Sequence, residues 1–302
     1  MIYILGVSYL IVFTLAYGVF DYGYITDIIH SLRGQLLLGT LGFAVLLLIK
    51  SRVFGLITLA ISMIAVSIHF IPQPLFDVDK KVHTLHTKQV NLRYSNQQIA
   101  QHLTRLNQEA WDLLVLFEFS DQHRELFASV KPEYTRFGYK EIEGFPMGIG
   151  VVSKYPIIYR QVVHINSPKS GYAHLKLLVN EKILNVVAVH PPSPRTQALW
   201  HRRNKVLAQV SLLLNDLEEP WLVVGDLNTV PWSNYIAINQ GKWCYTALGH
   251  YHSWTATKKG PSALMGLPID HCVTSPEVNI HTLQVTPFVG SDHLLLEHSL
   301  SF

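Results

Sequence analysis

The hydrophobic pattern divides this chain of 302 residues into two unequal parts. In the first part, three apolar runs with almost no charge occupy residues 2–20, 34–49 and 53–71. These runs are apolar on every side, unlike an amphipathic helix with a polar stripe, and they approach the roughly 20 residues that cross a bilayer. We therefore predict that residues 1–71 form a membrane anchor of three transmembrane helices, of which the second is the shortest.

The charges between the apolar runs predict the orientation of the anchor. Lys50 and Arg52 lie in the second connection, whereas the first connection carries Asp21 and Asp27 against a single Arg33. Because Lys and Arg favour the cytoplasmic side, the second connection and the amino terminus are expected inside. The chain after the anchor is then expected outside, on the periplasmic side of a cell's inner (cytoplasmic) membrane. The start of the chain lacks the basic residues of a cleaved signal peptide.

A polar linker over residues 72–89 opens with two prolines, and from residue 90 the pattern becomes that of an α/β domain. Short apolar runs typical of buried strands alternate with helical periods. Strands are expected at 90–94, 111–117, 145–156, 164–179, 183–189, 221–224, 253–255, 269–274 and 294–302, and helices at 95–106 and 196–217. The second helix has an apolar stripe, and four basic residues are expected on its solvated side: His201, Arg202, Arg203 and Lys205.

Composition narrows the functions that the second part can have. The whole chain has a formal charge of +3, and basic and acidic residues are nearly balanced beyond the anchor. This excludes a general basic field, so that binding of nucleic acid would need a local patch. The two cysteines, Cys244 and Cys272, do not make a disulfide framework, and the sequence leaves their pairing open.

A polar cluster follows the most apolar run of the domain. The run 221–224 stops at Gly225 and then delivers Asp226 and Asn228, two residues apart. A buried strand that ends in this way places both side chains on one side of the rim of a sheet, where active sites are commonly built. Taken alone, the motif is more typical of a simple turn, and only the rest of the chain favours a site.

Other polar residues stand at or near the ends of expected strands. Asn91 and Glu118 are brought close together by a strand, a helix and a second strand. A half-buried glutamate needs a cationic partner, for which a metal ion is one candidate, although strand-end glutamates are often simply solvated. His190 alone is more typical of a structural histidine. Asp270 lies inside an apolar strand, and His293 is its expected partner.

In chain order, this set resembles the endonuclease/exonuclease/phosphatase superfamily of metal-dependent phosphoesterases. The resemblance covers residues 90–302, and membrane-anchored bacterial members look most similar. It rests on Asn91, Glu118, His190, Gly225-Asp226-x-Asn228, Ile269-Asp270 and Ser291-Asp292-His293. The fold that it implies is α/β, a four-layered αββα sandwich with two mainly antiparallel sheets face to face and helices outside.

The resemblance also implies a metal site. Glu118 would hold Mg²⁺ or Mn²⁺, and Asn91 and Asp292 would lie close to the ion. Carboxylate and amide oxygens are the ligands that such hard cations prefer. A divalent metal is therefore the expected cofactor.

The remaining residues take catalytic roles by the same resemblance. Asp226 would orient or deprotonate the attacking water. Asn228 and His190 would contact the phosphoryl oxygens. His293, oriented by Asp270, would stabilise the transition state or act as acid or base. Positioned water and donors aimed at developing charge are what phosphoryl transfer requires.

The sequence thus predicts a membrane-anchored, metal-dependent hydrolase of phosphate esters, with phosphodiesters favoured. Nucleic acid, a lipid head group and a small metabolite remain open as substrates. DNA cleavage is not implied, because no long basic insertion for gripping a duplex is present. The expected partners are the substrate and the membrane, the latter through residues 1–71, and no protein partner is expected. The alternatives are a catalytically inactive, membrane-bound binding module of the same fold and a transport protein, which the nearly uncharged spans disfavour.

Overall fold

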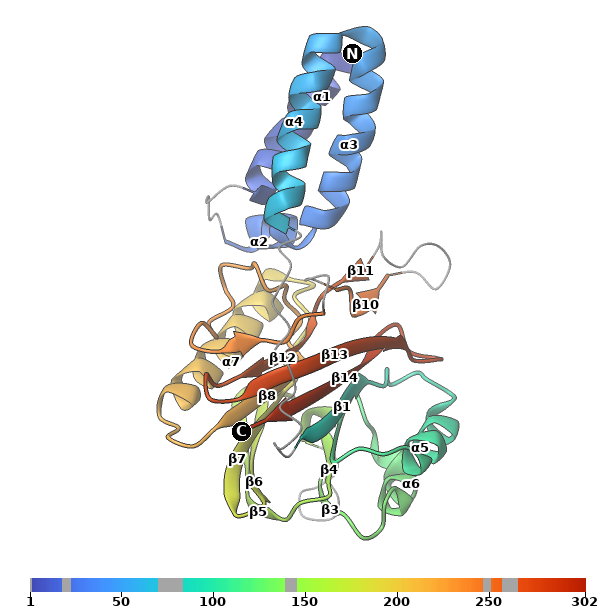
Figure 1. Ribbon diagram of the computed structural model, residues 1–302, viewed down its shortest axis with the longest axis vertical. Helices are drawn as coiled ribbons and strands as arrows, with labels where there is room; N and C mark the ends of the chain where they lie inside the picture. Colours follow the sequence, from blue (N-terminus) through green and yellow to red (C-terminus); the bar gives the residue numbers. More distant parts are fainter. Residues whose placement is uncertain (1, 18–22, 70–83, 139–145, 247–250, 257–265) are drawn as a thin grey trace.

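In the computed structural model, a bundle of helices stands at one end of an α/β domain (Figure 1). The bundle and its base consist of α1 (Ile2–Tyr17), α2 (Tyr24–Ser31), α3 (Arg33–Lys50) and α4 (Arg52–His69). The structure describes residues 2–17, 23–69, 84–138, 146–246, 251–256 and 266–302.

The helices of the bundle support fewer membrane spans than the sequence suggested. Within the described residues one helix, α3, is long and apolar enough to cross a membrane, with a hydropathy of 1.4. Helix α1 has 16 residues. The apolar part of α4, Arg52–Ala65, is shorter than the 18 residues required of a spanning helix. The prediction of three transmembrane helices is therefore not supported, and the span predicted as the shortest is the one that meets the criterion.

Helix α2 packs on the α/β domain, although the sequence suggested only a charged connection there. The Asp27 carboxylate is buried and accepts hydrogen bonds from Trp200 Nε1 at 2.9 Å, from Arg203 Nη2 and from Ser233 Oγ. Arg203 is 0% exposed. The prediction that Arg203 lies on the solvated side of its helix is therefore wrong. It occupies the apolar stripe because Asp27 matches its charge.

The first of two six-stranded sheets has the strand order β13-β14-β1-β2-β4-β3. It is antiparallel except for the parallel pair β1 and β2. Its strands are β1 (Leu85–Asn91), β2 (Leu113–Phe117), β3 (Thr135–Phe137), β4 (Gly150–Ser153), β13 (Asn279–Pro287) and β14 (Leu294–Ser301).

The second sheet has the order β5-β6-β7-β8-β12-β9 and is antiparallel except for the parallel pair β7 and β8. A separate two-stranded ladder joins β10 (Trp254–Thr255) to β11 (Gly266–Leu267). The strands of the second sheet are β5 (Ile157–Ser167), β6 (Ser170–Val179), β7 (Lys182–Val189), β8 (Trp221–Asp226), β9 (Lys242–Trp243) and β12 (Asp270–Thr274).

Alternating side chains build four layers from these elements. Val115 of β2 and Val224 of β8 belong to the core between the sheets. Their neighbours Leu116 and Val223 pack in the two outer cores, under helices on opposite faces. Strands buried on both faces are continuously apolar, which explains the runs in the sequence and confirms the α/β fold with two sheets. The covering helices are α5 (Ile99–Gln108) and α6 (Arg124–Ser129) on the first sheet, and α7 (Gln197–Asn215) on the second.

The domain begins earlier than its hydrophobic pattern indicated. Strand β1 starts at Leu85, inside the segment predicted as a linker, 72–89. A lysine in the middle of the strand concealed it. The Lys88 ammonium group is buried, but it lies 2.6 Å from a Glu109 carboxylate oxygen and 2.7 Å from one of Glu297. A buried charge with two such partners is tolerated in a strand.

Candidate active site

The topology brings predicted site residues to one edge of the two sheets. Asn91 ends β1 and Glu118 follows β2, and the parallel pairing of these strands brings their carboxyl ends together. His190 follows β7 and Asp226 ends β8, which form the other parallel pair. Strand β12 runs antiparallel to β8, so that its first residue, Asp270, lies opposite Asp226. Residues far apart in sequence thus meet at one rim.

Asn91 links two carboxylates, one from each sheet. Its Nδ2 donates to Glu118 Oε1 at 3.2 Å and to Asp226 Oδ2 at 3.0 Å. Its Oδ1 accepts from the backbone nitrogen of Arg93 at 3.0 Å, which fixes the orientation of the amide. The other oxygen of Glu118 accepts from the backbone nitrogen of Tyr94 at 3.0 Å. In this arrangement Asn91 holds Glu118 and Asp226 close together.

Two of the site residues have a left-handed backbone conformation. The φ angle is 53° at Glu118 and 51° at Asn228. Such conformations are unfavourable by about 1–3 kcal/mol for residues other than glycine, and they concentrate at functional sites. Between the strands, Gly225 packs against the carbonyl group of Val189 so closely that any side chain would clash. The glycine before Asp226 is therefore required by packing.

Asp270 and His293 form a buried pair. Nδ1 of His293 lies 2.8 Å from Asp270 Oδ2, and its Nε2 lies 3.7 Å from Asp226 Oδ2. Burial opposes a charge on the imidazole, but the negative charges of Asp270 and Asp226 outweigh it and raise the pKa of His293 to about 10. For Asp226, burial and the charge of Asp270 raise the pKa of the carboxyl group. The site therefore favours a protonated imidazole next to its carboxylates.

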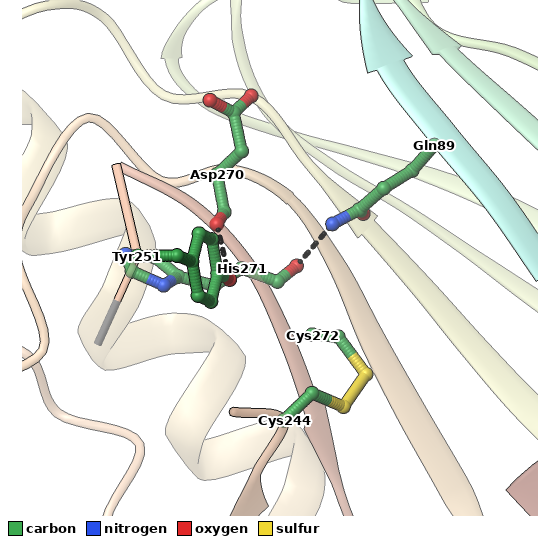
Figure 2. Close-up of a disulfide and its surroundings, with 6 residues drawn as sticks. All are labelled: Gln89, Cys244, Tyr251, Asp270, His271 and Cys272. Atoms are coloured by element: carbon green, nitrogen blue, oxygen red, sulfur yellow. Dashed lines mark hydrogen bonds between the residues drawn. A yellow bond between two sulfur atoms is a disulfide. The ribbon is translucent and has the colours of Figure 1, made fainter. Parts of the chain in front are cut away.

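The main chain around Asp270 is held by several contacts (Figure 2). Its carbonyl oxygen accepts from Tyr251 Oη at 2.8 Å, and its nitrogen donates to Ser253 Oγ at 2.8 Å. Two residues later, Cys272 is joined by a disulfide to Cys244, with 5.2 Å between their Cα atoms. Figure 2 shows the Asp270 carboxylate pointing away from the disulfide. The disulfide thus fastens the strand that carries Asp270 without entering the site.

His190 and Asn228 are oriented by main-chain groups. Nδ1 of His190 lies 3.0 Å from the carbonyl oxygen of Met147. Since a carbonyl group can only accept, Nδ1 carries the proton and Nε2 is left to contact a ligand. Nδ2 of Asn228 donates to the carbonyl oxygen of Pro191, and its backbone nitrogen donates to Asp226 Oδ1, both at 3.0 Å. These contacts fix two polar groups beside Asp226.

Asp292 is more exposed than the Asp270–His293 pair. Its Oδ2 accepts from Trp254 Nε1 at 3.2 Å, and its Oδ1 lies 3.8 Å from Arg93 Nε. The side chain is 28% exposed. It can therefore face a ligand in the cleft without prior unfolding of its surroundings.

A single cavity of about 1,380 Å³ brings most of the predicted site together. Asn91 and Asp270 lie behind its wall, each hydrogen-bonded to a residue that lines it. The predicted residues that line the cavity are Glu118, His190, Asp226, Asn228, Asp292 and His293.

The donors at this cavity fit a hard divalent cation. Three of the carboxylates that line it belong to Glu118, Asp226 and Asp292, and oxygen ligands of this kind suit Mg²⁺. The two hydrogen bonds to the Glu118 carboxylate come from neutral donors, so its charge is left for a cation. The structure also offers a cluster that the sequence did not predict as a metal site: ligand atoms of Asp226, Asp270 and His293 all lie within 4.8 Å of one another.

Two residues that support the site had no role in it predicted from the sequence. Nη1 of Arg203 donates to the carbonyl oxygen of Asn228 at 3.0 Å. Oγ of Ser291 donates to the carbonyl oxygen of Asn91 at 2.7 Å and accepts from the backbone nitrogen of His293 at 3.0 Å. A signal existed for both: Arg203 stands in the apolar stripe of its helix, and Ser291 opens the Ser-Asp-His motif.

Three solved structures with the same fold are distant from this chain in sequence. Sphingomyelinase C from Streptomyces griseocarneus has a TM-score of 0.55 at 16% identity, covering 72% of this chain and 99% of that chain. A mutant of beta toxin from Staphylococcus aureus with bound magnesium ions has a TM-score of 0.54 at 16% identity, with the same coverage. TDP2 from C. elegans has a TM-score of 0.58 at 13% identity, covering 74% of this chain and 77% of that chain.

The comparison with family models agrees with this fold. No curated protein matches the sequence. The model described as the Endonuclease/Exonuclease/phosphatase family matches residues 86–293, which include all eight predicted site residues. The chain therefore belongs to the endonuclease/exonuclease/phosphatase family.

Proposed function

We propose that this protein is a membrane-anchored, divalent-metal-dependent hydrolase of phosphate esters, acting on phosphodiesters. The observation that carries the proposal is the meeting of the Glu118–Asn91–Asp226 network with the Asp270–His293 pair at one rim. A binding module of the same fold would not need both an oriented imidazole and a cluster of carboxylates. The names of the similar structures, among them a sphingomyelinase, are consistent with a phosphodiester substrate.

The cofactor is Mg²⁺ or Mn²⁺, held through Glu118 with Asn91 and Asp292 nearby. When bound, the cation would withdraw negative charge from the phosphoryl group. The negative charge of the carboxylates around the cavity supports this assignment. A structural neighbour that carries magnesium ions supports it as well.

The residues of the chain would then position and protonate the reacting groups. Asp226 would orient or deprotonate the attacking water, since it lies at the centre of the network. Nδ2 of Asn228 would donate to a phosphoryl oxygen, and Nε2 of His190 would donate to another when the ring carries a second proton. The protonated imidazole of His293, oriented by Asp270 at 2.8 Å, would stabilise the developing charge or donate a proton.

The membrane placement is part of the same proposal. Figure 1 supports it, because the amino terminus and the connection between α3 and α4, with Lys50 and Arg52, lie at the end of the bundle far from the α/β domain. With positive charges inside, the domain would lie on the periplasmic side of the inner membrane. The Cys244–Cys272 disulfide fits that oxidising compartment.

A metal-dependent activity screen tests the proposed function. We expect purified full-length protein in detergent to cleave bis-p-nitrophenyl phosphate with Mg²⁺ or Mn²⁺, and EDTA to abolish cleavage. The Glu118→Gln variant should need about tenfold or more Mg²⁺ for half-maximal activity, because one charged ligand is lost. Glu125→Gln is the matched control, since Glu125 is exposed on α6 away from the cleft.

The screen also separates the alternatives. The substrates are a phosphomonoester, plasmid DNA and phospholipid micelles beside the soluble diester. Absence of cleavage in every metal would contradict the hydrolase and favour the inactive binding module. An unchanged Mg²⁺ curve for Glu118→Gln would remove that residue from the metal site but leave the hydrolase in place.

A further inference from the structure

Helix α2 has its polar side buried and its apolar side exposed. Thr26, Asp27 and His30 are buried, whereas Ile25 is 68% exposed and Leu32, at the carboxyl end of the helix, is 40% exposed. A surface helix in water has the opposite arrangement, because apolar groups leave water and polar groups stay in it. The reversed arrangement fits a helix whose outer side meets lipid.

The position of α2 supports the same conclusion. Figure 1 shows it where the helical bundle meets the α/β domain. Trp232 Nε1 donates to the carbonyl oxygen of His30 at 2.6 Å, and Gln35 Nε2, in the first turn of α3, donates to that of Gly266 in β11 at 2.9 Å. Apolar side chains are also exposed along α3 and α4. A bilayer surface at the level of α2 would cover all of them.

The same helix forms part of the wall of the catalytic cavity. The cavity that contains Asp226 and His293 extends to α2, to the first turn of α7 and to β11. These three elements lie next to the bundle (Figure 1). The apolar side chains that they contribute to its lining are Ile28, Leu32, Leu199 and Leu267.

The charges of the cavity do not favour a polyanion. Among the described residues that line it, four positive groups, Arg93, Lys169, Arg195 and the protonated His293, are balanced by four acidic residues, Glu118, Asp121, Asp226 and Asp292. Binding of nucleic acid depends on an excess of positive charge along the backbone. One or two anionic groups held by a metal ion suit this cavity better than a strand of phosphates.

We propose that the substrate is a lipid of the same bilayer with a phosphodiester head group, and that α2 is part of its binding site. This inference rests on the proposed function and names its substrate class. The phosphodiester lies at Glu118, Asp226 and His293, while the first part of the hydrocarbon lies against Ile28 and Leu32. Burial of apolar surface there stabilises the bound lipid. A soluble diester with the same head group lacks this contribution.

Selectivity for long-chain lipids tests the inference. We would measure kcat/KM of full-length protein in mixed micelles for dioleoyl phosphatidylcholine, phosphatidylethanolamine and phosphatidylglycerol and for sphingomyelin. The comparison substrates are the deacylated glycerophosphodiesters, bis-p-nitrophenyl phosphate and a single-stranded oligonucleotide. At least one long-chain lipid should be cleaved more than about tenfold better than its deacylated counterpart, the size expected for a lost apolar contact in a substrate pocket.

Variants of α2 separate a substrate wall from simple membrane contact. Ile28→Gln and Leu32→Gln should lower the ratio of lipid to soluble-diester kcat/KM by about tenfold. Ile25→Gln changes the same helix outside the cavity lining and should keep a ratio near that of the unmodified protein. Because Leu32 is already partly exposed, its variant keeps the test valid if Ile28→Gln does not fold.

Two kinds of failure are distinguishable. Cleavage of the soluble diester or the oligonucleotide without cleavage of any long-chain lipid would overturn the lipid substrate and leave the hydrolase. Equal ratios for Ile25→Gln, Ile28→Gln and Leu32→Gln would remove α2 from the substrate site. If no phosphate ester is cleaved, the proposed function fails and the inference fails with it.

Discussion

At the scale of single residues, His293 is held by contacts of its ring and of its main chain. Asp270 holds its Nδ1 at 2.8 Å, Ser291 Oγ accepts from its backbone nitrogen, and its Nε2 faces Asp226 at 3.7 Å. Asp270 has no separate route to a substrate, since it lies behind the cavity wall. The two residues are therefore expected to act as one unit.

Removal of either member should show this coupling. We predict that Asp270→Asn and His293→Ala each lower kcat/KM on a soluble diester by about 10²–10⁴, the range for a lost acid or base. The double variant should be little worse than His293→Ala alone, because the carboxylate has no function without the imidazole. Losses that add in activation free energy would contradict the pair, but they would not affect the family assignment.

Several site residues could be predicted from sequence because each interrupts an apolar pattern. Asp226 and Asp270 are charges next to or inside buried strands, and the structure brings them opposite each other. The link from Asn91 to Asp226 could not be predicted, since it depends on the approach of the two sheets. Main-chain partners such as the Met147 carbonyl group, which orients His190, leave no trace in side-chain identity.

At the scale of elements, the contact between α2 and α7 includes one buried ion pair. Asp27 and Arg203 are 1% and 0% exposed, and Arg203 also donates to the Asn228 carbonyl group. An ion pair buried to this degree is tolerated only while both partners are present. The attachment of α2 and the backbone of a catalytic residue therefore depend on the same guanidinium group.

Loss of the Asp27 charge should destabilise the protein. We predict that Asp27→Asn lowers the free energy of unfolding by about 3 kcal/mol or more, because Arg203 remains buried without its counter-charge. At roughly 2–4 °C per kcal/mol, Tm in detergent should fall by about 6–12 °C. Replacing both charges, as in Asp27→Leu with Arg203→Met, should recover part of the loss.

The control for this prediction is Asp216→Asn, which removes an exposed carboxylate at the end of α7. Its Tm should stay within about 1 °C of that of the unmodified protein, as for most surface changes. A small shift for Asp27→Asn, equal to that of Asp216→Asn, would show that α2 does not depend on the ion pair.

Elements with continuous apolar runs could be predicted, whereas two strands with several polar positions were missed or placed too late. Strands β7 and β8 and helix α7 agree with the periodicity of the sequence. Strand β1 was placed too late because Lys88 and Gln89 look like linker residues until their partners in other elements are known. Strand β13 was not predicted, since its polar positions obscure the alternation.

At the scale of the whole molecule, the α/β domain contains a histidine that should make its stability depend on pH. His298 of β14 is buried, and neither ring nitrogen has a hydrogen-bond partner within the described residues. Burial lowers the pKa of His298 to about 3. The unfolded chain binds a proton near pH 6.5, whereas the folded chain binds it only near pH 3. Between these two pH values only the unfolded chain binds the proton, so the free energy of unfolding falls as the pH falls from 6.5 toward 3. Above pH 6.5 this loss of stability is absent.

The size of this effect can be tested by substitution. At pH 5, His298 should lower the free energy of unfolding by about 2 kcal/mol, because each pH unit below 6.5 costs about 1.36 kcal/mol. We predict that Tm of the unmodified protein falls between pH 7 and pH 5 and that His298→Leu reduces this fall. His164→Leu, at an exposed position of β5, should keep it. An equal fall in all three proteins would show that other groups cause the pH dependence.

The arrangement of the chain across the membrane is the largest-scale prediction. In Figure 1 the carboxyl terminus lies on the α/β domain away from the bundle, so that a reporter fused there indicates the side of the membrane on which the domain lies. We predict that a reporter that fluoresces only in the cytoplasm is dark when fused after Phe302. A phosphatase reporter that is active only after export should be active at the same position, because Lys50 and Arg52 retain the other end of the bundle inside.

Fusions after Ser51, in the connection between α3 and α4, are the matched control and should give the reverse result. The reversal between the two positions tests the number of spans. Within the described residues only one helix is long and apolar enough to span a membrane, and a single span would give a different pair of reporter results. If α3 alone crossed the membrane, Ser51, α4 and the domain would all lie on the same side. Each reporter would then give the same result after Ser51 as after Phe302. Fluorescence after Phe302 would reverse the orientation, and it would also place the Cys244–Cys272 disulfide in a reducing compartment, where such bonds are rare.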